Sequence, residues 1–409
     1  MKCRFCKSTL TNIFLDLGMS PMANSFLKPT ELNTIEPSYP LCAYVCSKCF
    51  LVQLDEFEKP EEIFSNYAYF SSFSTTWNDH VEEFVNQLIN KFKIDKQKHV
   101  IEIASNDGYL LQHFKKNGIP ILGIEPAKNI ASYAESKGIP TINKFFGVDT
   151  AQELVQNDQK ADFLIAFNVM PHVPNLRDFV SGLKILLNHN GVIIIQFSAY
   201  LLKLIELNEF DMIYHEHFSY FSFGTLKKIF SESKLKIFDV EELPIHGGSL
   251  RVYITHENNN LYEKSICVDQ LLEKEKQFGL LEISTYENLA KNIQNVKQDI
   301  CNFFISARKE NKKIVCYGAP AKGNTLLNFC EIGKDFIKYT VDKNPHKQGL
   351  FLPGTHIQIN SPEEIQETKP DYLIILPWNL KEEIMKEMCS IRDWGGKFVT
   401  LIPKVEIIS

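Results

Sequence analysis

The sequence lacks both an excess of positive charge and any long apolar run. Lysine and arginine number 44 against 50 aspartate and glutamate residues, which gives a net charge of -6 at pH 7. Because proteins that bind nucleic acid usually carry a basic excess, we expect no nucleic-acid partner. The longest apolar stretches, such as 192–195, are far shorter than a membrane span, so we expect no membrane insertion.

An apolar leader is also missing. The first residues run directly into a polar pair of cysteines, which predicts a cytoplasmic protein. Ten cysteines in such a chain favour reduced thiols and a metal site over a disulfide framework. At 409 residues the chain is too long for one ordinary core, so we expect two or three domains. We expect a monomer, with a dimer as the alternative.

Two close pairs of cysteines supply a metal site. Cys3 and Cys6 form one C-x-x-C pair, and Cys46 and Cys49 form the second. Four thiolates in two pairs are the ligand set of a tetrahedral Zn²⁺ ion, with no position left open for catalysis. The sequence therefore predicts a structural zinc. A redox pair or chance spacing is the alternative.

The middle of the chain alternates short apolar strands with helical segments. The expected strands are 99–105, 121–126, 162–168 and 191–198. This alternation predicts an α/β fold with a parallel, doubly wound sheet, whose ligand site lies at the carboxyl ends of the strands. An antiparallel pair, 236–242 and 250–255, is expected to follow.

The first turn of this sheet lacks the G-x-G-x-x-G pattern of dinucleotide-binding proteins. Ser105, Asn106, Asp107 and Gly108 instead provide small and polar groups, which suit an amino-acid tail and a ribose. Glu125 ends the next strand, where it could accept hydrogen bonds from both ribose hydroxyls or be a solvated strand end. This combination favours S-adenosylmethionine over NAD.

The strand expected at 162–168 ends at Asn168, and the loop after it contains His172. Asn168 and this loop would form another wall of the cofactor site. His172 would either touch the ligand or hydrogen-bond its own loop.

The densest group of titratable residues is Tyr214-His215-Glu216-His217. Imidazole titrates near neutral pH, so a positioned histidine is the commonest general base, and Glu or Tyr can orient it. An ordinary amphipathic segment is the alternative. A metal bound by His215 and His217 would lack a third ligand at a recognisable spacing.

A glycine pair at 247–248 precedes Arg251, which is a candidate anion contact, although the glycines could equally form a plain hairpin turn. A second α/β unit then begins at about 313, with a glycine-rich turn and a helix start that carries Lys322 and Asn324. A helix N-terminus beside a lysine suits a diphosphate, but the spacing is not that of a P-loop.

Taken together, these motifs resemble the sugar C-methyltransferases that act on nucleotide-linked ketosugars. The resemblance covers nearly the whole chain and rests on the paired C-x-x-C module and on segments 103–108, 214–217, 246–251 and 317–325. It implies a zinc-binding module over 1–75, an S-adenosylmethionine domain over 76–300 and a C-terminal Rossmann-like domain over 301–409. The nucleotide-sugar is expected in the cleft between the last two.

The resemblance also implies residue roles. His217 corresponds to the general base, with Tyr214 and Glu216 beside it, and Lys322 corresponds to a contact with the sugar nucleotide. A further catalytic tyrosine falls at Tyr67 or Tyr69, of which we take Tyr69 as the candidate. The remaining candidate substrate contacts are His246, Arg251 and Asn324. One departure from the family pattern is 196–198, where relatives often carry Glu and Pro.

The expected reaction is methylation of C3 of a nucleotide-linked 4-ketosugar. A base would remove the acidic hydrogen next to the ketone, and the resulting enolate would attack the sulfonium methyl group. Methylation of an oxygen or nitrogen of a similar sugar is the enzymatic alternative. A nonenzymatic zinc scaffold that binds nucleotide-sugars is the alternative from another class.

Overall fold

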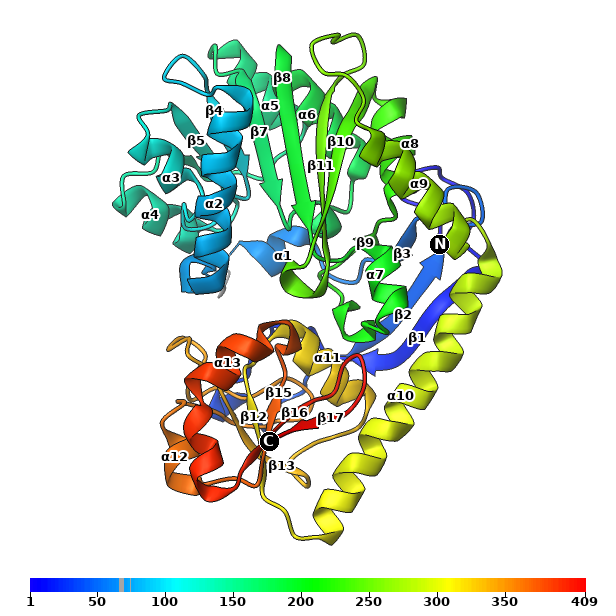
Figure 1. Ribbon diagram of the computed structural model, residues 1–409, viewed down its shortest axis with the longest axis vertical. Coiled ribbons are helices and arrows are strands. Elements are labelled where there is room, and N and C mark those ends of the chain that lie inside the picture. Colours follow the sequence, from blue (N-terminus) through cyan, green and yellow to red (C-terminus); the bar gives the residue numbers. More distant parts are fainter. Residues whose placement is uncertain (66–69, 74) are drawn as a thin grey trace.

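The computed structural model describes residues 1–65, 70–73 and 75–409, and the strands in this part of the chain form three sheets. Figure 1 shows a large sheet with its helices at the top and a smaller one at the bottom, with the N-terminal strands β1 and β2 to one side between them. None of the described helices is long and apolar enough to cross a membrane. One continuous apolar cluster includes Leu15, Ile193 and Ile374, so the three sheets share a core.

The large sheet has seven strands in the order β10-β11-β8-β7-β4-β5-β6. Their bounds are Val100–Ile103 (β4), Ile121–Ile124 (β5), Thr141–Ile142 (β6), Ala161–Phe167 (β7), Leu187–Phe197 (β8), Leu235–Leu243 (β10) and Ser249–His256 (β11). Strands β4 to β8 are parallel, whereas β11 runs antiparallel to both of its neighbours. The expected parallel strands and the antiparallel pair are confirmed.

Helices cover both faces of this sheet, as a doubly wound fold requires (Figure 1). They are α2 (Thr75–Phe92), α3 (Leu111–Lys116), α4 (Lys128–Ser136), α5 (Val148–Gln156), α6 (Leu176–Leu186) and α8 (Phe223–Glu232). The central strands are buried on both sides, and β4 is buried along its whole length. This is why they appear in the sequence as continuous apolar runs rather than as alternating patterns.

The C-terminal sheet has six strands in the order β14-β13-β12-β15-β16-β17. Their bounds are Ile314–Tyr317 (β12), Ile337–Val341 (β13), Ile359–Asn360 (β14), Tyr372–Ile375 (β15), Lys397–Thr400 (β16) and Glu406–Ile408 (β17). All pair in parallel except β17. Helices α11 (Ala321–Phe329), α12 (Glu364–Thr368) and α13 (Lys381–Glu387) pack with them.

The N-terminal sheet takes its last strand from the middle of the chain. Strands β1 (Asn12–Ser20), β2 (Tyr39–Val45) and β3 (Val52–Leu54) are followed in the sheet by β9 (Ser219–Tyr220). Strand β9 pairs antiparallel with β3, so the segment after His217 is built into the N-terminal sheet.

Two helices connect the large sheet to the C-terminal one. They are α9 (Ile266–Phe278) and α10 (Ile283–Lys309). Figure 1 shows α10 running along one side of the molecule from the upper to the lower body. Residue 300, at the expected domain boundary, lies inside this single helix. Tyr286 near its start packs its ring edge against Phe14 of β1, with ring centres 5.7 Å apart.

Candidate active site

Tyr214 and His217 lie at the two ends of one tight turn. The main-chain N–H of His217 donates to the carbonyl oxygen of Tyr214 at 2.9 Å, which closes the turn. The two rings lie 4.0 Å apart between their centres. The Tyr214 hydroxyl is 2.8 Å from His217 Nε2, so the turn brings the two side chains into direct hydrogen-bonding contact.

The hydrogen bonds of His217 define its tautomer. Nδ1 lies 3.0 Å from the carbonyl oxygen of Met212, and a carbonyl can only accept, so Nδ1 carries the proton. Nε2 is then the basic nitrogen and accepts from the Tyr214 hydroxyl. Burial and the neighbouring His172 lower the pKa of His217 well below its usual value, so the ring is neutral at pH 7.

His172 belongs to the same cluster. Its ring centre is 4.7 Å from that of His217, and its Nδ1 donates to the main-chain oxygen of Glu216 at 2.7 Å. Burial lowers the pKa of His172 to about 4. Sequence reasoning expected His172 at the cofactor wall, whereas the structure places it against Glu216 and His217.

The neighbouring residues in the turn face different ways. Glu216 is 2% exposed, and its Oε2 accepts from Asn24 Nδ2 at 2.7 Å. Burial raises the pKa of Glu216 to about 7, and the Asn24 hydrogen bonds oppose that rise. His215 instead packs against the Tyr39 and Phe57 rings, which stack on each other, and its Nε2 lies 3.3 Å from the Pro40 carbonyl oxygen. The structure gives His215 a packing role.

The N-terminal zinc module is hydrogen-bonded to the chain that follows the turn 214–217. The main-chain N–H of Leu54 in β3 donates to the Phe218 oxygen at 3.1 Å, directly after His217. The Thr225 hydroxyl donates to the Cys49 carbonyl oxygen at 2.9 Å. The segment that carries His217 is therefore fixed to the strand and the knuckle that lie next to the cysteines.

The four predicted metal ligands come together. The Sγ atoms of Cys3, Cys6, Cys46 and Cys49 lie within 4.8 Å of one another. Zn–S bonds of about 2.3 Å in a tetrahedron separate the sulfurs by roughly 3.8 Å, so the cluster fits zinc. Gln53 Nε2 lies 3.4 Å from Cys3 Sγ and would support the bound thiolate. The expected structural zinc site is confirmed.

At the carboxyl edge of the large sheet, Glu125 lies behind the first turn. Its Oε2 accepts from the Asn106 N–H at 2.9 Å and its Oε1 from the Ala127 N–H at 2.8 Å. Its side chain is 5% exposed, and burial raises its pKa to about 7. The carboxylate therefore fixes the shape of the turn while each oxygen keeps a lone pair for a ligand hydroxyl.

Three other predicted cofactor residues lie in the same turn, and a fourth, Asn168, follows β7. Asp107 Oδ1 and Ser105 Oγ are buried and have no hydrogen-bond partner among the described residues, which fits a polar ligand at this edge. Gly108 has a positive φ of 77°, which favours glycine. Asn168 Oδ1 accepts from the Ser198 N–H at 3.1 Å and so joins the ends of β7 and β8.

The segment before α2 covers this turn. The Ser71 N–H donates to Asn106 Oδ1 at 2.9 Å, and the Ser72 hydroxyl donates to Asp107. The Phe70 ring stacks on His346 of the C-terminal domain, 5.8 Å away. Tyr67 and Tyr69 lie outside the described residues, as does the side chain of His246.

Lys322 lies between the two large bodies. It is on the first turn of α11, contacts Asn379 and lies 4.0 Å above the ring of Trp378. Burial lowers its pKa to about 8, although Asp211 and Glu209 favour the charged form. Trp378 Nε1 donates to Asp211 Oδ2 at 2.7 Å, so this region joins the C-terminal domain to the residues just before Tyr214.

Two further residues lie close to the turn between β12 and α11 of the C-terminal sheet. Asn324 is 1% exposed, and neither of its amide atoms has a hydrogen-bond partner among the residues described. Asp342 ends β13 as Glu125 ends β5, and its Oδ2 accepts from the Ala319 N–H at 2.8 Å. Sequence reasoning missed Asp342, although an acidic residue at the end of the second strand was the signal used for Glu125.

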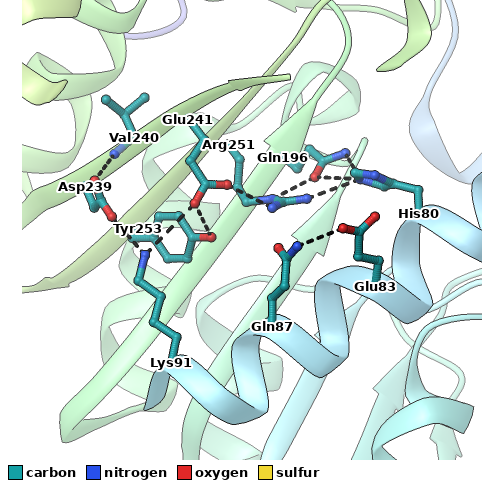
Figure 2. Close-up of polar contacts among 10 residues, drawn as sticks. All are labelled: His80, Glu83, Gln87, Lys91, Gln196, Asp239, Val240, Glu241, Arg251 and Tyr253. Atoms are coloured by element: carbon teal, nitrogen blue, oxygen red, sulfur yellow. Dashed lines mark hydrogen bonds and ion pairs between the residues drawn. The ribbon is translucent and has the colours of Figure 1, made fainter. Parts of the chain in front are cut away.

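Arg251 lies in the interior of the large sheet, and Figure 2 shows its contacts. It is 2% exposed and donates to Gln196 Oε1 at 2.9 Å and Glu241 Oε2 at 2.9 Å, with His80 Nε2 at 3.2 Å. Its guanidinium also lies 4.3 Å from the ring centre of Phe84 on α2. Sequence reasoning expected an anion contact here, whereas these contacts join α2 to β8, β10 and β11.

Three family models match consecutive parts of the chain. A putative zinc-binding domain matches residues 3–64, a methyltransferase domain matches 77–240, and a C-methyltransferase C-terminal domain matches 244–403. Together with the seven-stranded sheet and the four-cysteine cluster, they define a class I S-adenosylmethionine-dependent methyltransferase with a zinc-binding N-terminal module.

Among curated proteins, C-methyltransferase NovU from Streptomyces niveus is 30% identical over 408 residues, covering 100% of this chain and 97% of the relative. The chain belongs to the C-methyltransferase family. Among solved structures, magnesium protoporphyrin IX methyltransferase from Synechocystis PCC 6803 is similar over 44% of this chain and 82% of its own, with 15% identity and a TM-score of 0.35. The PH0226 protein from Pyrococcus horikoshii OT3 is similar over 49% of this chain and 99% of its own, with 13% identity and a TM-score of 0.38.

Proposed function

We propose that the protein methylates C3 of a nucleotide-linked 4-ketosugar and that His217 is the general base. The observation that carries this proposal is the neutral His217 ring, whose Nδ1 donates to Met212 and whose Nε2 faces the Tyr214 hydroxyl. A buried neutral imidazole with one basic nitrogen is suited to remove a carbon-bound proton next to a ketone.

The first step is proton transfer. The Tyr214 O–H first turns from Nε2 to the ketone oxygen, which frees the one lone pair of that nitrogen. His217 Nε2 then takes the C3 hydrogen as a proton, the C–H electron pair forms the C3–C4 double bond, and the ketone oxygen takes the negative charge. Nε2 then carries a proton and becomes a donor, so the Tyr214 oxygen accepts from it. The Tyr214 O–H meanwhile donates to the enolate oxygen, where the new charge lies.

The second step forms the carbon–carbon bond. S-adenosylmethionine, when bound, supplies an electrophilic methyl group on a sulfonium. The enolate carbon would accept this methyl group, and the electrons of the broken C–S bond would pass to sulfur. Ser105, Asp107 and Glu125 are the residues that would hold the cofactor, with the cofactor domain assigned to 76–300.

The nucleotide-sugar is assigned to the space between this domain and the C-terminal domain, 301–409. Lys322 lies at that junction, on the first turn of α11, and its cation would contact the diphosphate or sugar. Asn324, with both amide atoms buried and free among the described residues, would contact the same ligand.

The test is incubation of the protein with S-adenosylmethionine labelled with ¹³C in the methyl group and with a panel of nucleotide-linked 4-ketosugars. We expect a ¹³C signal at the chemical shift of a methyl group on carbon. A signal at the shift of an O-methyl or N-methyl group would contradict the assignment of the carbon acceptor.

A further inference from the structure

Three parts of the chain converge on Glu216. Its main-chain oxygen accepts from His172 of the methyltransferase domain at 2.7 Å, and its carboxylate accepts from Asn24 of the N-terminal module at 2.7 Å. Lys347 of the C-terminal domain is the cation whose charge favours the ionised carboxylate. The side chain of Asn24 donates directly to this carboxylate.

The loop that carries Asn24 is fixed on both sides. Met22 and Ala23, just before it, are 5% and 2% exposed. Just after it, Leu27 and Phe351 of the C-terminal domain exchange two main-chain hydrogen bonds of 3.0 and 2.9 Å. The Asn24 amide is therefore held at a defined place between the catalytic turn, 214–217, and the C-terminal domain.

We propose that Asn24 is a positioning residue of the catalytic site, which holds the carboxylate of Glu216 in one orientation within the turn that carries His217. This inference rests on the proposed function, in which His217 is the base, and on the place beside that base that the family resemblance gives Glu216. It also gives the N-terminal module a part in catalysis beyond zinc binding. An amide suits the task because it donates a hydrogen bond and carries no charge of its own.

The same contact affects the ionisation of Glu216. Hydrogen bonds from the side chain and the main chain of Asn24 favour the charged carboxylate, so loss of the side-chain bond raises the pKa of Glu216 further. The other groups that act on this carboxylate are Lys347, which favours its charged form, and Glu58, which opposes it. His172 is held neutral by burial.

The test compares the wild type with Asn24→Ala and the isosteric Asn24→Asp. Asn33→Ala, an exposed asparagine of the same module, is the matched control. We expect kcat to fall at least tenfold in both Asn24 variants, with KM for S-adenosylmethionine and zinc content unchanged. In Asn24→Ala the pH limb of kcat that depends on Glu216 moves to higher pH. Asn33→Ala retains wild-type kcat and the same pH profile.

A double-mutant cycle separates positioning from general destabilisation. In a Glu216→Gln background, Asn24→Ala should lower kcat less than threefold. Equal losses in both backgrounds, or an Asn24→Ala enzyme within twofold of wild type at every pH, would overturn the inference.

A wild-type protein without methyl transfer to any ketosugar would overturn the proposed function instead. Infrared titration of the Glu216 carboxyl, with Glu216→Gln as the reference, then tests Asn24 without turnover. An upward pKa shift in Asn24→Ala supports the contact, and an unchanged pKa contradicts it.

Discussion

The Tyr214 hydroxyl lies 2.8 Å from Nε2 of His217, while Nδ1 of the same ring lies 3.0 Å from the Met212 carbonyl oxygen. These two contacts fix the orientation and the tautomer of the ring and place the Tyr214 hydroxyl at its basic nitrogen. The turn 214–217 is held by β9, which pairs with β3 of the zinc module. The chemistry assigned to His217 therefore depends on both sheets.

Replacement of His217 by Asn should abolish most of the activity. We expect kcat for C-methylation to fall at least 100-fold, because general-base catalysis contributes about 10² to 10⁴ in rate. Binding of S-adenosylhomocysteine, measured by calorimetry, should change little. His189→Asn, at an exposed histidine of the same domain, is the matched control. A His217→Asn enzyme within a few-fold of wild type would show that another group is the base.

Stability should fall in acid because of His172. Its folded-state pKa of about 4 lies below the usual value near 6.5, so the unfolded chain takes up the proton first as the pH falls. The stability that depends on a neutral His172 is therefore fully present above pH 6.5 and is lost as the pH falls towards 4. The free energy of unfolding of wild type, relative to His172→Asn, should drop by about 3 kcal/mol over this range. Urea titrations at several pH values measure this, and parallel curves would contradict it.

Zinc removal should disturb the catalytic turn as well as the N-terminal module. Cys46→Ser should lose zinc and lower both the melting temperature and kcat, because β3 joins the zinc knuckle to β9. Hydrogen exchange of residues 214–221 should become faster. Cys389→Ser, at an exposed cysteine outside the cluster, is the control and should keep one zinc per chain. Unchanged hydrogen exchange at 214–221 after zinc loss would show that the turn that carries His217 does not depend on the zinc site.

The periodic parts of the molecule could be predicted from the sequence. Buried parallel strands such as β4 are continuous apolar runs, and C-x-x-C spacing defines the zinc ligands. The two-residue strands β6 and β9 could not be predicted, because two residues show no period. Pairing of β9 with β3 also depends on contacts between distant segments, for which a single sequence carries no local signal.

Side-chain roles were harder to predict, because they also depend on contacts between segments that are distant in the sequence. Arg251 follows two glycines, which suggested an anion contact, but its hydrogen-bond partners come from α2 and from two other strands, β8 and β10. Asn24 is separated from Glu216 by 192 positions, and nothing in its own loop marks it. In contrast, Tyr214, Glu216 and His217 are close in sequence, so their grouping was visible before the fold.

Arg251 should therefore contribute to stability rather than to substrate binding. Arg251→Met leaves Glu241, Gln196 and His80 without their shared donor, and we expect the free energy of unfolding to fall by about 2 to 4 kcal/mol. The KM for the nucleotide-sugar should stay within twofold of wild type. A stable variant with a strongly raised KM would indicate an anion contact instead.

Lys322→Met, in contrast to Arg251→Met, should impair substrate binding. Loss of its cation should raise the KM for the nucleotide-sugar at least tenfold, while the affinity for S-adenosylhomocysteine stays unchanged. Lys334→Met, an exposed lysine of the same domain, is the matched control. An unchanged KM in Lys322→Met would place the diphosphate elsewhere in the C-terminal domain.

Solvent exchange at C3 tests the central claim most directly. Wild-type protein is incubated in D₂O with a nucleotide-linked 4-ketosugar and S-adenosylhomocysteine, so that deprotonation can occur without methyl transfer. Proton NMR should show loss of the C3 hydrogen signal with wild type and at least 100-fold slower loss with His217→Asn. Methyl transfer to carbon by wild type with no exchange at C3, or equal exchange by both proteins, would contradict His217 as the base that forms the enolate.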